Sequence, residues 1–240
     1  MSDQLIIKQR GEVLDLTLND PDRGNLVTEE ISGALADALT SVGPDVKLVR
    51  LRGAGPDFCR GRLAPRIDRA TATALDFRGR TTAGPLRLYG AFRECPAPVL
   101  GVIQGQALGV GCALAGLCDL AVASEDAVFA IPEMNRNIPP ALVMSALADR
   151  VPYKALVHMV LLREPVTAAA ALAAGIVGQA VPAADLDRAA AAIEESVLAC
   201  HAPALQAVKE YMRSAPSMAP AARASLASTL IATVDSSQTR

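Results

Sequence analysis

The chain alternates short apolar runs with amphipathic segments, and this pattern predicts an α/β fold. Residues 5–9, 13–18 and 46–53 are rich in Val, Ile and Leu and are bounded by turn residues, which is typical of strands. Residues 28–43 instead repeat apolar side chains at helical spacing, with Thr28 as a candidate N-cap. Because strands alternate with helices, we expect a sheet with parallel members.

The central part of the chain repeats this pattern around a glycine-rich segment. The apolar runs 98–105 and 119–124 are expected for strands that are buried on both faces. Between them, residues 105–116 contain four glycines, three alanines and one cysteine. Small side chains let a ligand approach the backbone, and a helix N-terminus offers free N–H groups to an acceptor oxygen or an anion. Tight packing alone also explains such glycines, so the segment by itself leaves both interpretations open.

After about residue 139 the pattern becomes mainly helical. Several segments combine helical periodicity with a high alanine content, and only residues 176–182 are expected to be extended. We therefore predict a core over residues 1–182 and a C-terminal helical region over residues 183–240. The final segment, residues 228–240, loses the pattern and is predicted to fray.

Composition and charge narrow the class of partner. The chain is 51% hydrophobic and 20% charged with a formal net charge of −2, which favours neither nucleic acid nor a membrane surface as a partner. No apolar run reaches the roughly 20 residues that span a bilayer. Five cysteines without a CxxC pair and two histidines are too few for a zinc site, so we expect no metal. Free thiols and the absence of a signal-peptide pattern predict a cytoplasmic protein.

Three segments in order provide a more specific signal. They are RLRGAGPDFCRGRLA, then APVLGVIQGQALGVGCALAGLCDLAVASEDAVFAIPEMNRNIPP, and finally VTAAAALAAGIVGQAVP. Their order and spacing resemble the crotonase family of acyl-coenzyme A enzymes, in which F-C-x-G is followed by G-G-G-C and P-E motifs. The resemblance implies an α/β fold with a crotonase-like spiral of β-β-α units and a C-terminal helical region. It also implies an acyl-CoA substrate, no permanently bound cofactor, and a homotrimer or a dimer of trimers.

The resemblance assigns an oxyanion hole to two backbone N–H groups. In the family, one donor follows the F-C-x-G turn and the other belongs to the G-G-G element, and in this chain they fall on Arg62 and Val110. Because the donors are backbone groups, the change from small residues to Arg and Val retains them. Preorganised donors aimed at a thioester enolate can each supply about 3 kcal/mol.

The acidic residues differ from those of a hydratase of this family, which uses two glutamates. The first position is Ala113 in this chain, and the second is Glu133 in AIPEMN. One carboxylate beside an oxyanion hole can remove a proton α to a thioester and return it elsewhere, which isomerises a double bond. Asp119 matches a position that we interpret as structural. We interpret Cys112 and Cys118 as small core residues rather than nucleophiles.

The phosphates of coenzyme A require cations at an exposed rim. The resemblance assigns this role to Arg23 in the first loop, to Arg60 and Arg62 around the oxyanion turn, and to Lys209 in a closing helix. Arginine suits phosphate because its planar fork donates two parallel hydrogen bonds. Gly109 is included among the coenzyme A-binding residues because it allows a close approach to the helix N-terminus.

We therefore predict an acyl-CoA enzyme that stabilises a thioester enolate, with Glu133 as the acid and base. An enoyl-CoA isomerase or a hydratase-like lyase is its concrete form. Two alternatives stay open: a true enoyl-CoA hydratase with an atypical water site, and a degenerate family member that binds acyl-CoA without turnover. A plain α/β domain whose glycines only pack predicts no affinity for coenzyme A.

Overall fold

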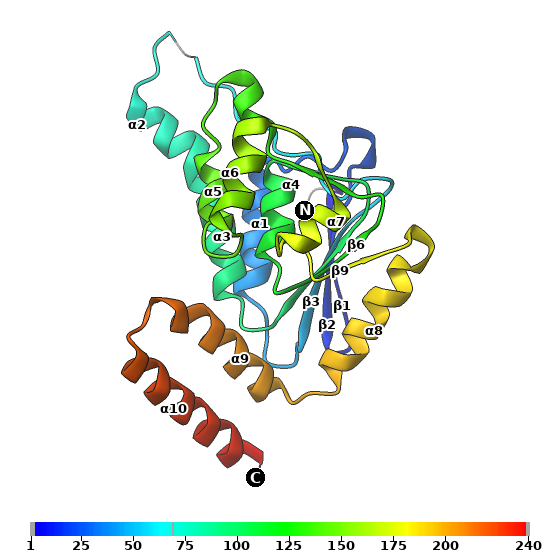
Figure 1. Cartoon of the computed structure of the whole chain (residues 1–240), viewed down its shortest axis with the longest axis vertical. Helices are drawn as coiled ribbons and strands as arrows, with labels where there is room; N and C mark the ends of the chain where they lie inside the picture. Colours follow the sequence, from blue (N-terminus) through cyan, green and yellow to red (C-terminus); the bar gives the residue numbers. More distant parts are fainter. Residues whose placement is uncertain (1–2, 69, 239–240) are drawn as a thin grey trace.

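The computed structural model describes residues 3–68 and 70–238, which form a mixed α/β fold with two sheets (Figure 1). Within these residues the larger sheet has the strand order β1-β2-β3-β4-β6-β9, and the smaller sheet has the order β5-β7-β8. β1 is antiparallel to β2, and the other neighbours in the larger sheet are parallel. The strands are β1 Leu5–Arg10, β2 Val13–Leu18, β3 Leu48–Gly53, β4 Val99–Ile103, β5 Gln106–Leu108, β6 Leu120–Ser124, β7 Val128–Ala130, β8 Val166–Thr167 and β9 Gln179–Val181.

The chain passes back and forth between the two sheets. It leaves the larger sheet after β4, enters the smaller sheet at β5, and returns to β6 through helix α4 (Val110–Leu117). It then enters the smaller sheet again at β7, which is parallel to β5. This alternation confirms the predicted spiral of β-β-α units.

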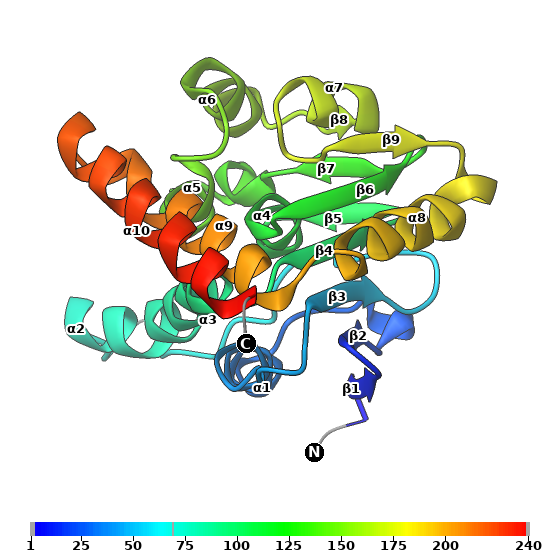
Figure 2. The ribbon, with the colours of Figure 1, turned by 90° about the horizontal axis from the view of Figure 1, so that it is seen from below.

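Helices cover both faces of the larger sheet (Figures 1 and 2). α1, α3 and α4 lie on one face, and α8 lies on the other, where it packs on β3, β4 and β6. Leu186 and Ala190 of α8 join a small apolar cluster with Leu100 and Val122 of the sheet. α8 begins after residue 182, so the predicted C-terminal region contributes a layer of the core. Besides α4, the helices up to residue 198 are α1 Glu29–Thr40, α2 Ala74–Phe77, α3 Ala83–Glu94, α5 Ala141–Leu147, α6 Tyr153–Leu162, α7 Ala168–Ala173 and α8 Leu186–Leu198.

The last two helices lie together at one end of the larger sheet. α9 (Ala202–Ser214) and α10 (Pro220–Gln238) run side by side at one end of the molecule (Figures 1 and 2). The predicted fraying is therefore wrong for residues 228–238, while residues 239–240 lie outside the described residues. Packing on α9 compensates for the missing apolar pattern of α10. Among the described helices, none has both the length and the apolar character that a membrane span requires.

α1 begins at the residue that its sequence predicts. The Thr28 hydroxyl oxygen accepts a hydrogen bond from the Ile31 N–H at 3.2 Å, which satisfies one of the free donors of the first turn. Ile31, Leu35 and Leu39 form the buried stripe of this helix, which packs against α3. A local cap and an apolar stripe therefore fix α1 together.

We expect Thr28→Ala to lower the free energy of unfolding by about 1 kcal/mol, because the Ile31 N–H loses its acceptor. Urea denaturation measures this loss. Thr229→Ala is the matched control, since the exposed Thr229 hydroxyl donates to the Ser225 carbonyl within α10. We expect the control to change the free energy by less than about 0.5 kcal/mol. Equal losses in the two variants would contradict the capping role of Thr28.

Candidate active site

A pair of backbone hydrogen bonds brings the F-C-x-G turn against the start of α4. The Cys59 N–H donates to the Gln106 carbonyl at 3.0 Å, and the Leu108 N–H donates to the Cys59 carbonyl at 2.9 Å. Gly111 in the first turn of α4 faces the same carbonyl, and a Cβ at Gly111 would lie 2.1 Å from the Cys59 oxygen. Only glycine permits this close approach of the turn and the helix.

The N–H group of Arg62 is left free by the bridge that holds this turn to residue 27. The Val27 N–H donates to the Gly61 carbonyl, and the Leu63 N–H donates to the Val27 carbonyl, each at 3.0 Å. In a parallel bridge these two bonds direct the N–H of the middle residue to the opposite side. Among the described residues, the Arg62 N–H has no hydrogen-bond acceptor. It is therefore available to a ligand.

The second predicted donor, Val110, is the first residue of α4. Gly109 precedes it with φ +52°, and the first intrahelical bond runs from the Ala113 N–H to the Gly109 carbonyl at 3.0 Å. In the described part of the chain, the Val110 N–H has no acceptor. The Val110 side chain is buried in the main apolar cluster, so the donor and the larger side chain occupy different environments. The presence of valine at this position, where the family motif has glycine, therefore leaves the backbone N–H available.

Glu133 lies against the same helix start. It belongs to a 3₁₀ turn, Pro132–Arg136, and a Cβ at Gly109 would lie 2.7 Å from its Oε1. Its Oε2 is buried and has no hydrogen-bond partner among the described residues. Burial raises the pKa of the Glu133 carboxyl, and its own backbone N–H and the charge of Arg136 oppose this shift. A poorly solvated carboxylate beside a helix N-terminus is suited to exchange a proton with a ligand.

The cysteines near this helix are core residues, as predicted. Cys112 and Cys118 are buried, and burial raises the pKa of each thiol to about 12. The neighbouring charge of Glu133 raises the pKa of Cys112 further. A neutral, buried thiol is a poor nucleophile. Ala113, at the position of the missing glutamate, is fully buried.

Arg23 and Arg60 have exposed side chains in neighbouring segments, since the Arg60 stem packs on Gly24. A Cβ at Gly24 would lie 2.3 Å from Arg60 Cδ, so the Arg60 stem covers this glycine. Arg23 pairs with Asp20 at 2.7 Å, and Arg60 lies 3.9 Å from Asp57. The two arginine side chains remain 53% and 51% exposed. The structure leaves both candidate cations exposed, and their role toward phosphate stays a prediction.

The Arg62 side chain is occupied within the protein. Its Nη1 donates to the Thr81 carbonyl at 2.6 Å, and its Nη2 pairs with Glu29 Oε2 at 3.0 Å. The side chain is only 10% exposed. This placement does not support the phosphate-binding role predicted for the Arg62 guanidinium. It instead joins the oxyanion turn to α1 and to the π-helical turn Arg78–Thr82.

Lys209 is also bound within the fold. Its Nζ donates to the Ala97 carbonyl at 2.8 Å and pairs with Asp119 Oδ2 at 2.8 Å, and the side chain is 8% exposed. Asp119 accepts a further hydrogen bond from the Val99 N–H at 2.8 Å. The pair holds α9 against the starts of β4 and β6, which agrees with the structural interpretation of Asp119. The placement of Lys209 does not support a role in binding coenzyme A.

Sequence reasoning missed two residues whose side chains make hydrogen bonds to the backbone next to the F-C-x-G turn. The buried Asn25 donates through Nδ2 to the Ala54 carbonyl at 2.9 Å and to the Asp57 carbonyl at 2.7 Å. Asp57 Oδ1 accepts a hydrogen bond from the Gln106 N–H at 2.9 Å. Both residues stand in turn-forming stretches, where Asn and Asp are ordinary, so the sequence offers no signal that distinguishes them.

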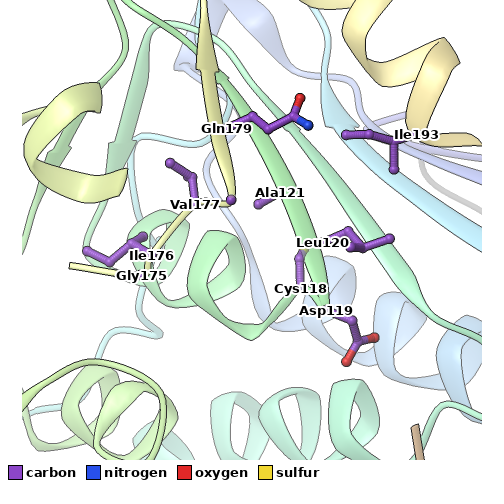
Figure 3. A pocket seen from close by; sticks show the side chains of 10 residues that line it. Cys118, Asp119, Leu120, Ala121, Gly175, Ile176, Val177, Gln179 and Ile193 are labelled. Atoms are coloured by element: carbon purple, nitrogen blue, oxygen red, sulfur yellow. The ribbon is translucent and has the colours of Figure 1, made fainter. Parts of the chain in front are cut away.

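A separate cavity of about 340 Å³ opens between the start of β6, the segment before β9, and α8 (Figure 3). Its charged lining residue is Asp119, and Figure 3 shows this carboxylate turned away from Gln179 and Ile193. Because Asp119 is already paired with Lys209, this cavity has no available acid or base among its lining residues. Glu133 therefore remains the candidate acid or base.

Comparison with known proteins identifies the family. The family model described as enoyl-CoA hydratase/isomerase matches residues 8–240. The 2,3-dehydroadipyl-CoA hydratase of Escherichia coli K12 is 32% identical over 226 residues, which cover 90% of this chain and 84% of that protein. The chain belongs to the enoyl-CoA hydratase/isomerase family, also called the crotonase family.

Solved structures of the family have the same fold. An enoyl-CoA hydratase of Mycobacterium smegmatis matches with a TM-score of 0.90 and 28% identity, covering 97% of this chain and 91% of that one. A Thermobifida fusca YX protein solved in complex with CoA matches with a TM-score of 0.87 and 24% identity, covering 99% and 95% of the two chains. The fold predicted from the sequence is therefore confirmed.

We expect Lys209→Met to lower the free energy of unfolding by about 3 kcal/mol, because Asp119 loses its buried partner. Urea denaturation measures the loss. Lys154→Met on the exposed side of α6 removes the same charge and is expected to have little effect. The affinity for coenzyme A, measured by calorimetry, should be unchanged in both variants. A selective loss of affinity in Lys209→Met without destabilisation would contradict the structural role.

Glu133→Gln should be more stable than the wild type near pH 7.5. Because burial raises the folded pKa above its ordinary value of 4.5, the stability linked to the protonated carboxyl is complete below 4.5 and is lost as the pH rises through the folded pKa. The gain of the variant should therefore shrink as the pH falls toward about 4. Denaturation at several pH values measures it, with Glu164→Gln, an exposed glutamate, as the control. A gain that does not depend on pH would refute this origin.

Proposed function

We propose that the protein catalyses proton transfer at the α-carbon of an enoyl-CoA thioester. The observation that carries this proposal is the half-buried Glu133 carboxylate, whose buried Oε2 has no hydrogen-bond partner among the described residues and whose Oε1 lies against Gly109 at the start of α4. Val110 is the first residue of α4, and its N–H has no acceptor among the described residues. The hydrogen bonds of Cys59 hold the turn that contains Arg62 beside the start of this helix.

In this proposal the thioester oxygen accepts hydrogen bonds from the N–H groups of Arg62 and Val110. Negative charge develops on this oxygen when the α-proton leaves, and donors that are already fixed by the backbone stabilise it without reorganisation. The positive end of α4 adds to this stabilisation. If each donor stabilises the transition state by about 3 kcal/mol, the two donors together lower the barrier by about 6 kcal/mol.

Glu133 acts as the acid and base. It removes a proton from C2 of a 3-enoyl thioester, and the electron pair moves into the dienolate. The proton on the carboxyl exchanges with solvent, and Glu133 then delivers a proton to C4, which gives the 2-enoyl product and restores the carboxylate. One carboxylate is sufficient for this isomerisation, which suits a chain with Ala113 at the first acidic position. The raised pKa of Glu133 brings the carboxyl closer to the working pH.

Hydration is the second candidate reaction. The similarity to a 2,3-dehydroadipyl-CoA hydratase favours it, because that relative is 32% identical across most of both chains. Addition of water to a 2-enoyl thioester also places negative charge on the thioester oxygen, in the enolate of a 3-hydroxyacyl thioester, so it uses the same donors and the same carboxylate. It differs in requiring a group that binds water near C3.

Coenzyme A is the proposed carrier, with Arg23 and Arg60 at its phosphates. Both guanidinium groups are exposed, the Arg60 stem packs on Gly24, the chain neighbour of Arg23, and a related structure was solved with CoA bound. We also propose assembly as a homotrimer or a dimer of trimers. Exposed apolar side chains on the last two helices support self-association: Val208, Met212 and Ile231.

Incubation with a short 3-enoyl-CoA in deuterated water tests the proposed function. We expect deuterium to enter C2 and C4 and the 2-enoyl isomer to accumulate, as followed by NMR. Glu133→Gln should reduce this exchange at least 100-fold, within the range of about 10²–10⁴ for general acid and base catalysis. Glu164→Gln, which changes an exposed glutamate, should retain it.

Exchange that survives in Glu133→Gln would disprove the role of this carboxylate. Binding of the thioester without exchange in the wild type would instead favour a non-catalytic acyl-CoA-binding protein. The absence of any binding would favour a domain whose glycines only pack.

A further inference from the structure

A tyrosine hydroxyl faces the same buried region as Glu133. Tyr89 is on the buried side of α3 and is 3% exposed, and α3 packs on α4. Its hydroxyl oxygen is buried and has no hydrogen-bond partner among the described residues, as is also true of Glu133 Oε2. A buried hydroxyl normally has a partner, so an unpartnered one indicates a place for a ligand or a water molecule.

The groups that surround this hydroxyl are those of the candidate active site. The Tyr89 hydroxyl lies within electrostatic range of Arg62, Glu133, Cys59 and Cys112. Cys59 belongs to the oxyanion turn, and Cys112 immediately precedes the alanine at the position of the missing glutamate. The unpartnered Tyr89 hydroxyl, on a helix that packs on α4, therefore lies near the oxyanion elements and near Glu133, the acid that the motif retains.

The acyl chain of an enoyl thioester has no polar atom at C2, C3 or C4 that could bind a hydroxyl. A water molecule or the hydroxyl of a 3-hydroxyacyl group can do so, because each donates and accepts hydrogen bonds. Because Ala113 replaces one of the two motif glutamates, a second polar group is needed to bind this oxygen atom. Tyr89 supplies such a group from a helix that the family motifs do not include.

We propose that the Tyr89 hydroxyl, together with Glu133, binds the oxygen atom that is added to C3 of a 2-enoyl thioester, so that the enzyme is a hydratase. This inference rests on the proposed function. The water oxygen forms a bond to C3, and one of its protons moves to Glu133 while the π electrons form the enolate. Glu133 then gives this proton to C2. Water is added in full, and Tyr89 keeps its own proton throughout.

The protonation state of Tyr89 agrees with this role. Burial raises the pKa of the phenol above its ordinary value of 10.0, and the charge of Glu133 raises it too, while Arg62 opposes the shift. The phenol therefore stays neutral at working pH and acts as a hydrogen-bond donor, not as a base.

The test compares hydration with proton exchange in Tyr89→Phe, which removes only the hydroxyl. Hydration of 2-butenoyl-CoA is followed by the loss of absorbance of the conjugated thioester. Deuterium exchange at C2 of butyryl-CoA reports enolate formation without addition of water. We expect Tyr89→Phe to lower the kcat of hydration by about 10- to 100-fold, the scale of one lost hydrogen bond to a reacting group. Exchange on butyryl-CoA should change by less than about threefold.

Two controls separate this inference from the proposed function. Tyr153→Phe removes a hydroxyl from a side chain that is 79% exposed and should alter neither rate. Glu133→Gln should abolish both rates. Unchanged hydration in Tyr89→Phe, or an equal loss of hydration and exchange, would overturn the role of Tyr89. Exchange without any hydration in the wild type would overturn it too and leave the proposed function standing. The loss of both reactions in the wild type would overturn the proposed function itself.

Discussion

The close approach of the Cys59 carbonyl to Gly111 is the constraint on which the rest of the site depends. The Leu108 N–H bonds this carbonyl, and a Cβ at residue 111 would collide with it at 2.1 Å. The oxyanion turn and the start of α4 therefore come together only if residue 111 is glycine. The same approach constrains the separation of the two proposed donors, because Val110 directly precedes Gly111 and Arg62 follows Cys59 by three residues.

The two donors tolerate large side chains because those side chains leave the site. The Arg62 guanidinium turns toward Glu29 and Thr81, and the Val110 side chain enters the core. The backbone N–H of each residue remains free among the described residues. A motif that acts through its backbone can therefore change its side chains without losing its proposed chemistry, and the Arg62 side chain instead links α1 to the π-helical turn Arg78–Thr82.

Sequence reasoning located the elements whose determinants are local. The cap at Thr28, the apolar strands and the order of the family motifs were sufficient to predict the spiral and to select Glu133, Arg62 and Val110. The partners of Lys209 and of the Arg62 side chain were not predictable. Each lies in a segment far away in the chain, so only the folded arrangement reveals that these cations are already neutralised. The last part of α10, residues 228–238, was expected to fray because its helical structure depends on contact with α9.

The burial of Glu133 links stability to function. A carboxyl without a hydrogen-bond partner at Oε2 is costly to ionise, and the fold keeps it at the N-terminus of α4, where a second unpartnered group, the Tyr89 hydroxyl, faces the same region. Both groups would be better satisfied on the surface. Their retention together is explained if a ligand completes their hydrogen bonds, because the free energy lost in the empty site is then recovered when that ligand binds.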